Sequence, residues 1–199
     1  YDDIGLYSHG CSMGDYIIII TTALTTAIVP QMQTSYRKGD LKTYRNLYYL
    51  CQSVAIISSA LICIWMDDVY SILIRNEQLS KSSEIAMLMC FANVVYPFYA
   101  FMSAPVFIKK NTKQLLWLVF FPGFLNLFFC VFFIPVWGYR VAIYSTMASY
   151  WSQLLIPFFV DYYNKSVKRW LGNLNKIWLL LIMLLCIVCI SNLIGNFSY

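Results

Sequence analysis

The chain has 199 residues, of which 60% are hydrophobic and 12% are charged, with a formal net charge of +5. About 25% of the residues of an ordinary soluble domain are charged, so this chain has too few charges to cover a surface that faces water. The composition excludes an ordinary soluble protein and indicates an integral membrane protein.

Uncharged stretches of the chain are long enough to cross a membrane as helices. A transmembrane helix needs about 20 mostly apolar residues, and six stretches without Asp, Glu, Lys or Arg reach that length. Strands are excluded because open sheet edges cannot face lipid and barrel strands alternate polar with apolar residues. The predicted fold is an all-α, polytopic transmembrane helix bundle in one domain, residues 1–199. Its predicted spans are 12–32, 46–66, 85–108, 114–136, 140–160 and 177–195.

The first predicted span, 12–32, is unusually polar. Asp15 stands near its start, and Pro30 is expected to close it. Its second half holds four threonines, Thr21, Thr22, Thr25 and Thr26. Ionisable groups in membrane segments usually face protein or a water-filled cavity, so we expect this helix to face one of these. His9, which precedes the span, is expected to be a solvated loop residue.

The charge of the connections alternates along the chain. The connection after the first span is basic, the next, over 67–84, is net acidic, and the third is basic again. The fourth is a tight turn with Arg140, and the fifth is basic. Eleven of the fourteen Lys and Arg residues thus fall on one side, and this side is predicted to be cytoplasmic. Tyr44, Tyr48 and Tyr49 start the second span and are expected at the headgroup layer.

Polar groups within the spans are candidates for lining a substrate cavity. The candidates are Asp15, Thr22, Thr25, Gln52, Asn93, Asn126, Arg140 and Gln153. Such amide and hydroxyl groups also bond neighbouring helices in membrane proteins, at about 0.6 kcal/mol each, so a purely structural role stays open for each. Arg140 is a candidate for meeting a diphosphate, or it anchors the turn.

Prolines within the spans are candidate hinges, because each removes a backbone hydrogen bond from its helix. The main candidates are Pro30, Pro97 and Pro122, and Pro105 and Pro157 are further ones. Kinks at proline are also ordinary in membrane helices, so this alternative stays open.

The sequence gives little support for an enzyme. A Cys-x-x-Cys pair, Cys186 and Cys189, lies in a Leu/Ile run without a polar partner. We find no phosphate-binding glycine loop, metal-ligand cluster or nucleophile triad. The expectation is a protein that is not an enzyme and has no cofactor, metal or nucleic-acid partner.

Two segments resemble a known family of membrane proteins. Gly5-Leu6-Tyr7-Ser8 precedes the first span, and Ser35-Tyr36-Arg37-Lys38-Gly39-Asp40 follows it. Trp137-Gly138-Tyr139-Arg140-Val141-Ala142 is similar to a "G-x-x-G-A" helix opening, with Arg140 and Val141 where a small residue and glycine are usual. Over roughly residues 4–160 the chain resembles the O-antigen (oligosaccharide) flippases of polysaccharide biosynthesis. These belong to the multidrug/oligosaccharidyl-lipid/polysaccharide exporter superfamily.

The resemblance implies the carboxy-terminal lobe of a two-lobed exporter in the bacterial inner membrane. Its partners would be the amino-terminal lobe of the same protein, which we expect to precede Tyr1, and membrane lipids. The implied substrate is a polyprenyl-diphosphate-linked oligosaccharide, for example a lipopolysaccharide O-antigen precursor. Residues 177–194 would form an additional helix after the common twelve.

Two other functions stay open. A cation-coupled multidrug exporter of the same superfamily needs an ionisable coupling site deep in the bundle, and the sequence shows none in this part. A membrane glycan polymerase or ligase needs a large exterior loop with Arg or His. The acidic connection 67–84 is too short for such a loop.

Overall fold

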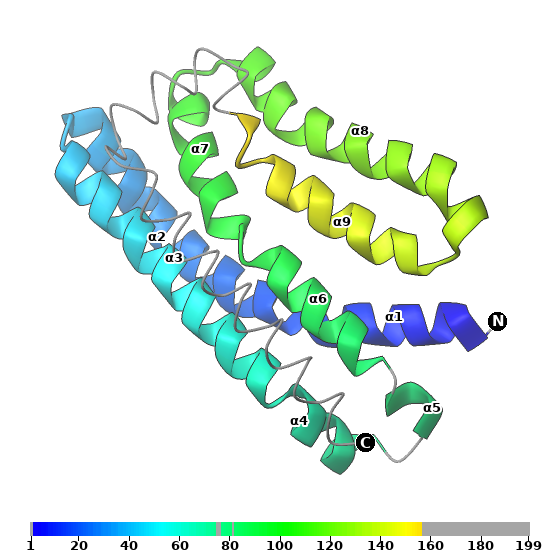
Figure 1. Ribbon diagram of the computed structural model, residues 1–199. Helices are drawn as coiled ribbons and strands as arrows, with labels where there is room; N and C mark the ends of the chain where they lie inside the picture. The colour runs from blue at the N-terminus through cyan, green and yellow to red at the C-terminus, as the bar shows by residue number, and fades with distance from the viewer. Residues whose placement is uncertain (1, 75–76, 81, 157–199) are drawn as a thin grey trace.

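The computed structural model describes residues 2–74, 77–80 and 82–156, and the regular structure in these residues is all helical (Figure 1). The helices are α1 (Asp2–Gly14), α2 (Tyr16–Lys38), α3 (Leu41–Ile64), α4 (Met66–Leu73), α5 (Glu77–Ser80), α6 (Ser83–Asn93), α7 (Tyr96–Ile108), α8 (Thr112–Trp137) and α9 (Arg140–Ser152). The prediction of an all-α protein is confirmed.

Four helical stretches of the described residues are long and apolar enough to cross a membrane. They are Ile4–Lys38, Leu41–Ile64, Ser83–Ile108 and Thr112–Trp137. The chain is therefore a multi-pass membrane protein. The fifth predicted span, 140–160, is described up to residue 156, and α9 covers its first part. The sixth, 177–195, lies outside the described residues, as does Pro157.

The first apolar stretch is longer than residues 12–32, because α1 precedes α2 with only Asp15 between them. Pro30 lies inside α2, so the expectation that it closes the helix is wrong. The helix ends instead at Gly39, whose φ of 74° lies in the left-handed region that glycine enters without a Cβ clash. The Asp40 amide donates to the Ser35 carbonyl at 2.9 Å across this cap.

The turn after Gly39 starts α3, which packs beside α2 as a hairpin (Figure 1). Asp40 is the N-cap of α3 and accepts a hydrogen bond from the Thr43 amide at 3.1 Å. The hydrogen bonds from Thr43 and the nearby charge of Lys42 hold the pKa of Asp40 below its ordinary value.

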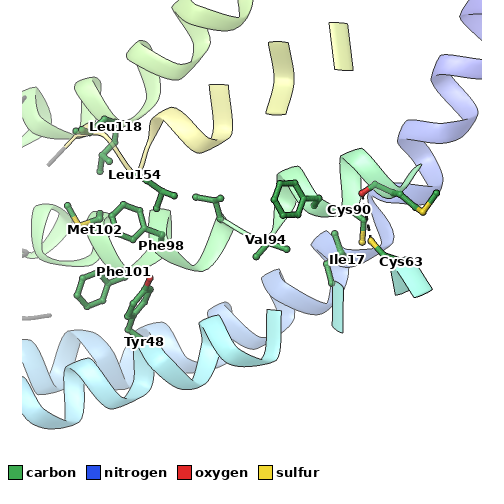
Figure 2. Close-up of a cluster of buried hydrophobic side chains, with 14 of the residues drawn as sticks. Ile17, Tyr48, Cys63, Cys90, Val94, Phe98, Phe101, Met102, Leu118 and Leu154 are labelled. Carbon is green, nitrogen blue, oxygen red and sulfur yellow. Dashed lines mark hydrogen bonds between the residues drawn. The ribbon is translucent and has the colours of Figure 1, made fainter. Parts of the chain in front are cut away.

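The main core is centred on α6 and α7 and also takes buried residues from α2, α3, α4 and α8. Tyr44 and Tyr48 are fully buried there, and the Tyr44 hydroxyl donates to the Phe101 carbonyl at 2.6 Å. Figure 2 shows Tyr48 pointing from α3 toward Phe98 and Phe101. Their rings fill the space between two helices, and their position at the headgroup layer stays a prediction.

The remaining elements complete the bundle. The connection 67–84 contains the short helices α4 and α5. The α8 and α9 helices form a second hairpin, in which α9 packs on α6 and α8 on α7 (Figure 1).

The basic connections after α2 and after α7 lie at one end of the bundle. The Lys109 ammonium is 6.0 Å from the centre of the Tyr36 ring, which joins the two turns. Figure 1 shows both turns at the end opposite to α4 and α5. The structure thus gathers these two basic segments, far apart in sequence, at one end.

Candidate functional site

Two of the long apolar stretches are interrupted. The first is broken at Asp15, between α1 and α2, and the third at Val94 and Val95, between α6 and α7. Pro97 explains the second break, because it has no amide N–H for the Asn93 carbonyl. At the next position, the Phe98 N–H donates to the Val95 carbonyl at 2.9 Å, and the carbonyl of Val94 accepts a hydrogen bond from the Gln52 side chain at 3.0 Å. Gln52 of α3 therefore satisfies a backbone group that the break sets free.

The two breaks are joined by one hydrogen bond between side chains. The Asn93 amide donates to the Asp15 carboxylate at 3.1 Å. Asn93 lies ten residues after Ser83 and fifteen before Ile108 in its apolar stretch. At 1.5 Å per residue these are about 15 Å and about 22 Å, so the pair lies near the middle of the stretch. A carboxylate thus stands deep in the described helices, at the point where two helices are interrupted.

Close approach of α1 to α6 holds this crossing in place. A Cβ atom added at Gly14 would lie 2.5 Å from the Met89 Cβ and 2.6 Å from the Ala86 carbonyl oxygen. A Cβ atom at Gly10 would lie 2.6 Å from Ile85. This contact was not predicted from the sequence, although glycines four residues apart are a known signal for helix packing in membranes.

His9 also belongs to this contact. Its Nδ1 lies 2.9 Å from the hydroxyl of Ser82, and its ring packs edge-on against Tyr70 of α4. Ser82 donates to the Leu79 carbonyl at 2.7 Å, so it accepts from His9 and from Tyr70. The expectation of a solvated loop histidine is therefore wrong, because α1 is a helix packed on α6.

A cavity of about 610 Å³ lies beside the helix breaks, between α6–α7 and the α8–α9 hairpin, and Ile18 of α2 closes one side. Three predicted residues converge on it, namely Asn93, Asn126 and Gln153. The described residues that line it include no Lys, Arg, His, Asp or Glu. Its main polar lining comes from Asn93, Asn126, Gln153, Tyr96, Tyr99 and Tyr150.

Asn126 both lines the cavity and bonds a neighbouring helix, the two roles that the sequence left open. It lines the cavity, and its amide donates to the Thr146 hydroxyl at 3.2 Å while its oxygen accepts from Cys130 at 3.3 Å. The bond to Thr146 connects α8 to α9, the bond from Cys130 lies within α8, and together they fix the orientation of the Asn126 side chain. Pro122 and Gly123 of α8 also line the cavity, so this hinge candidate lies next to the site.

The other candidates do not line this cavity. The hydroxyls of Thr22 and Thr25 donate to carbonyls of their own helix, at Ile18 and Thr21, which is a local bond. Gln52 is buried behind the break. Arg140 lies with Glu84 and Tyr139 around a small separate recess at the start of α9.

The tyrosines of the cavity were not predicted. Tyr96 and Tyr99 of α7 and Tyr150 of α9 lie in apolar stretches, where an aromatic residue gives no sign of its role. A comparison of the chain with protein-family models, curated proteins and solved structures finds no match. The functional assignment therefore rests on the chemistry of the cavity and of the helix breaks.

Proposed function

We propose that the chain is part of a membrane transporter that flips polyprenyl-diphosphate-linked oligosaccharide or polysaccharide precursors across the bacterial plasma membrane. These precursors would serve the synthesis of cell-surface glycans such as lipopolysaccharide O-antigen. The observation that carries the proposal is a cavity near the middle of long apolar helices, with several amide and tyrosine side chains in an otherwise apolar lining. A glycan is costly to pass through hydrocarbon and its lipid tail is not, so a flippase needs a polar path at this depth.

The interrupted helices support a protein that changes shape. Transporters often place their substrate site at mid-membrane, beside discontinuous helices that permit alternating access. Here the break at Pro97 and the pair Pro122 and Gly123 both adjoin the cavity. The amino-terminal lobe of the same protein would complete the path, and the exposed apolar face of α8 would meet that lobe or lipid.

The proposal is tested by deleting the gene in its source bacterium and measuring the leaflet of the lipid-linked glycan. Spheroplasts are treated with a membrane-impermeant glycosidase or lectin before and after lysis. We expect the glycan-lipid to be protected until lysis in the deletion strain and accessible in a strain that carries the intact gene. Normal accessibility in the deletion strain would refute a flippase.

One observation favours a second function, a cation-coupled multidrug exporter. The sequence shows no deep coupling site, but the structure places the Asp15 carboxylate at the crossing of two helix breaks. Ionisable groups at such depth commonly bind coupling ions or protons. Expression in drug-sensitive cells should then speed sodium- or proton-driven ethidium efflux, and Asp15→Asn should abolish the gain while keeping the contact with Asn93.

A further inference from the structure

The cavity has polar groups that the protein leaves without partners. The Gln153 carboxamide and the hydroxyls of Tyr96, Tyr99 and Tyr150 make no hydrogen bond to another described residue. An occupant that displaces water from the cavity leaves these groups without a partner unless it bonds them itself, and this loss costs free energy. An occupant of the cavity must therefore offer hydrogen-bonding groups, which a bare hydrocarbon tail lacks.

The charge of the cavity excludes the diphosphate as its occupant. Proteins bind phosphate groups with Arg, with Lys, with metal ions or with free N–H groups at helix N-termini. The described lining contains no cationic side chain. The α7 helix begins beside the cavity, but Pro97 has no N–H and the Phe98 N–H donates to the Val95 carbonyl at 2.9 Å. The Asp15 carboxyl group accepts a hydrogen bond from Asn93, which lines the cavity, and offers no positive charge. No described lining residue supplies a counter-charge for a diphosphate, so we place the diphosphate elsewhere.

The remaining chemistry of the cavity matches a sugar ring. A pyranose has apolar C–H faces and a rim of hydroxyls that both donate and accept hydrogen bonds. A tyrosine offers a flat apolar face and a polar tip, and a glutamine side chain both donates and accepts. Tyr96 and Tyr99 stand on α7 with ring centres 6.2 Å apart, whereas Tyr150 and Gln153 belong to the α9 end. A ligand between them would touch both walls.

We propose that this cavity binds the uncharged sugar residues of the carried glycan-lipid and leaves its diphosphate outside. The inference rests on the proposed flippase function and adds the part of the substrate that this site takes. A volume of about 610 Å³ lies within the usual range of about 300–1,000 Å³ for small-molecule sites. The sugar would sit beside the break at Pro97, where its binding can favour one arrangement of α6 and α7.

The test uses the full-length protein in lipid nanodiscs and the native Cys130 thiol, which lines the cavity. Alkylation of Cys130 by a small maleimide is followed by mass spectrometry in the presence of short-chain probes. The neutral probes are hexyl glucoside, hexyl galactoside and hexyl N-acetylglucosaminide. The charged probes are geranyl diphosphate and hexyltrimethylammonium. We expect at least one neutral glycoside to slow alkylation several-fold, and the two charged probes to leave the rate unchanged.

Variants test whether protection of Cys130 depends on the Gln153 and Tyr150 side chains. Gln153→Leu and Tyr150→Phe keep the size of the side chains and remove hydrogen-bonding atoms, so each should weaken protection by the glycoside several-fold. Tyr144→Phe is the matched control, because Tyr144 is on the same helix and lies 54% exposed outside this cavity. Its protection should equal that of the unchanged protein. Unfolding temperatures of all three variants show whether the fold is retained.

Several outcomes would overturn the inference. They are protection by geranyl diphosphate, protection by hexyltrimethylammonium alone, no protection by any glycoside, or full protection in both cavity variants. The leaflet assay separates this failure from that of the proposed function. Glycan-lipid that depends on the protein for flipping, without glycoside protection, would leave the flippase standing and remove only the sugar site. Protection of Cys130 by a glycoside, with a normal leaflet distribution in the deletion strain, would keep the sugar site and refute the flippase.

Discussion

Polar residues of the same type have different roles in this bundle, and the residue type alone does not show which role each one has. Gln52 and Gln153 are both glutamines within apolar stretches. Gln52 is buried and donates to the carbonyl of Val94, which the helix break sets free. Gln153 has no such partner among the described residues and lines the cavity. One amide is thus structural and the other is available to a ligand.

Replacing Gln52 by leucine should destabilise the protein without changing the cavity wall. The Val94 carbonyl would lose its partner in a buried place, which costs about 1–3 kcal/mol of the free energy of unfolding. The measurement is reversible unfolding in mixed micelles. Ser53→Ala, next in sequence and exposed, is the control and should change stability little. An unchanged stability for Gln52→Leu would show that the carbonyl has another partner.

At the scale of elements, the apolar stretches give helices at nearly the expected places. The charge-free stretch 114–136 lies within α8, Thr112–Trp137, because one property, the length of apolar chain between charges, decides both. The sequence did not predict the length of the first helical stretch, because the first span was expected to begin only at residue 12. The residues before it form α1, where Gly10 and Gly14 pack on α6.

Gly14→Ala should loosen α1 from α6. The added Cβ would meet backbone and Cβ atoms that cannot turn away, so the helices must separate, at about 1–3 kcal/mol as for other overpacked sites. Gly5→Ala, in the same helix, is the matched control, because nothing lies within 4 Å of its added Cβ. Both are compared by unfolding in micelles. Equal stability of the two variants would contradict the close packing.

The break between α6 and α7 depends on Pro97. Pro97→Ala restores an amide N–H that can bond the Asn93 carbonyl, so we expect slower hydrogen exchange across residues 93–98. If the break serves as a hinge, translocation should fall in the leaflet assay while the unfolding temperature is kept. Pro135→Ala, an exposed proline within α8, is the control and should change neither. Unchanged translocation with Pro97→Ala would remove the hinge role.

On the scale of the whole molecule, the separation of charge predicts the orientation in the membrane. The basic turns after α2 and α7 lie together at one end, and Asp67 and Asp68 of α4 lie at the other (Figure 1). Because basic connections are retained in the cytoplasm, Lys110→Cys should react with an impermeant maleimide only after cell lysis. Asp68→Cys should react in intact cells. Labelling of the unchanged protein measures the background from its native thiols. Labelling of Lys110→Cys in intact cells, with Asp68→Cys labelled only after lysis, would show the opposite topology.

The sequence by itself determined that this is a helical membrane protein and where its basic connections fall. Both follow from local properties, namely apolar length and charge between spans, which the bilayer selects whatever the packing. It also named polar residues that the structure brings near one another, but not which of them would meet.

Only the tertiary structure decided that Asn93 reaches Asp15 and that three tyrosines join Asn126 and Gln153 around one cavity. Asp15 and Asn93 are 78 positions apart, so their contact depends on how two interrupted helices cross. That crossing is set by small residues at helix contacts and by a proline break. These residues can be seen in the sequence, but the helix that each of them meets is decided only by the packing.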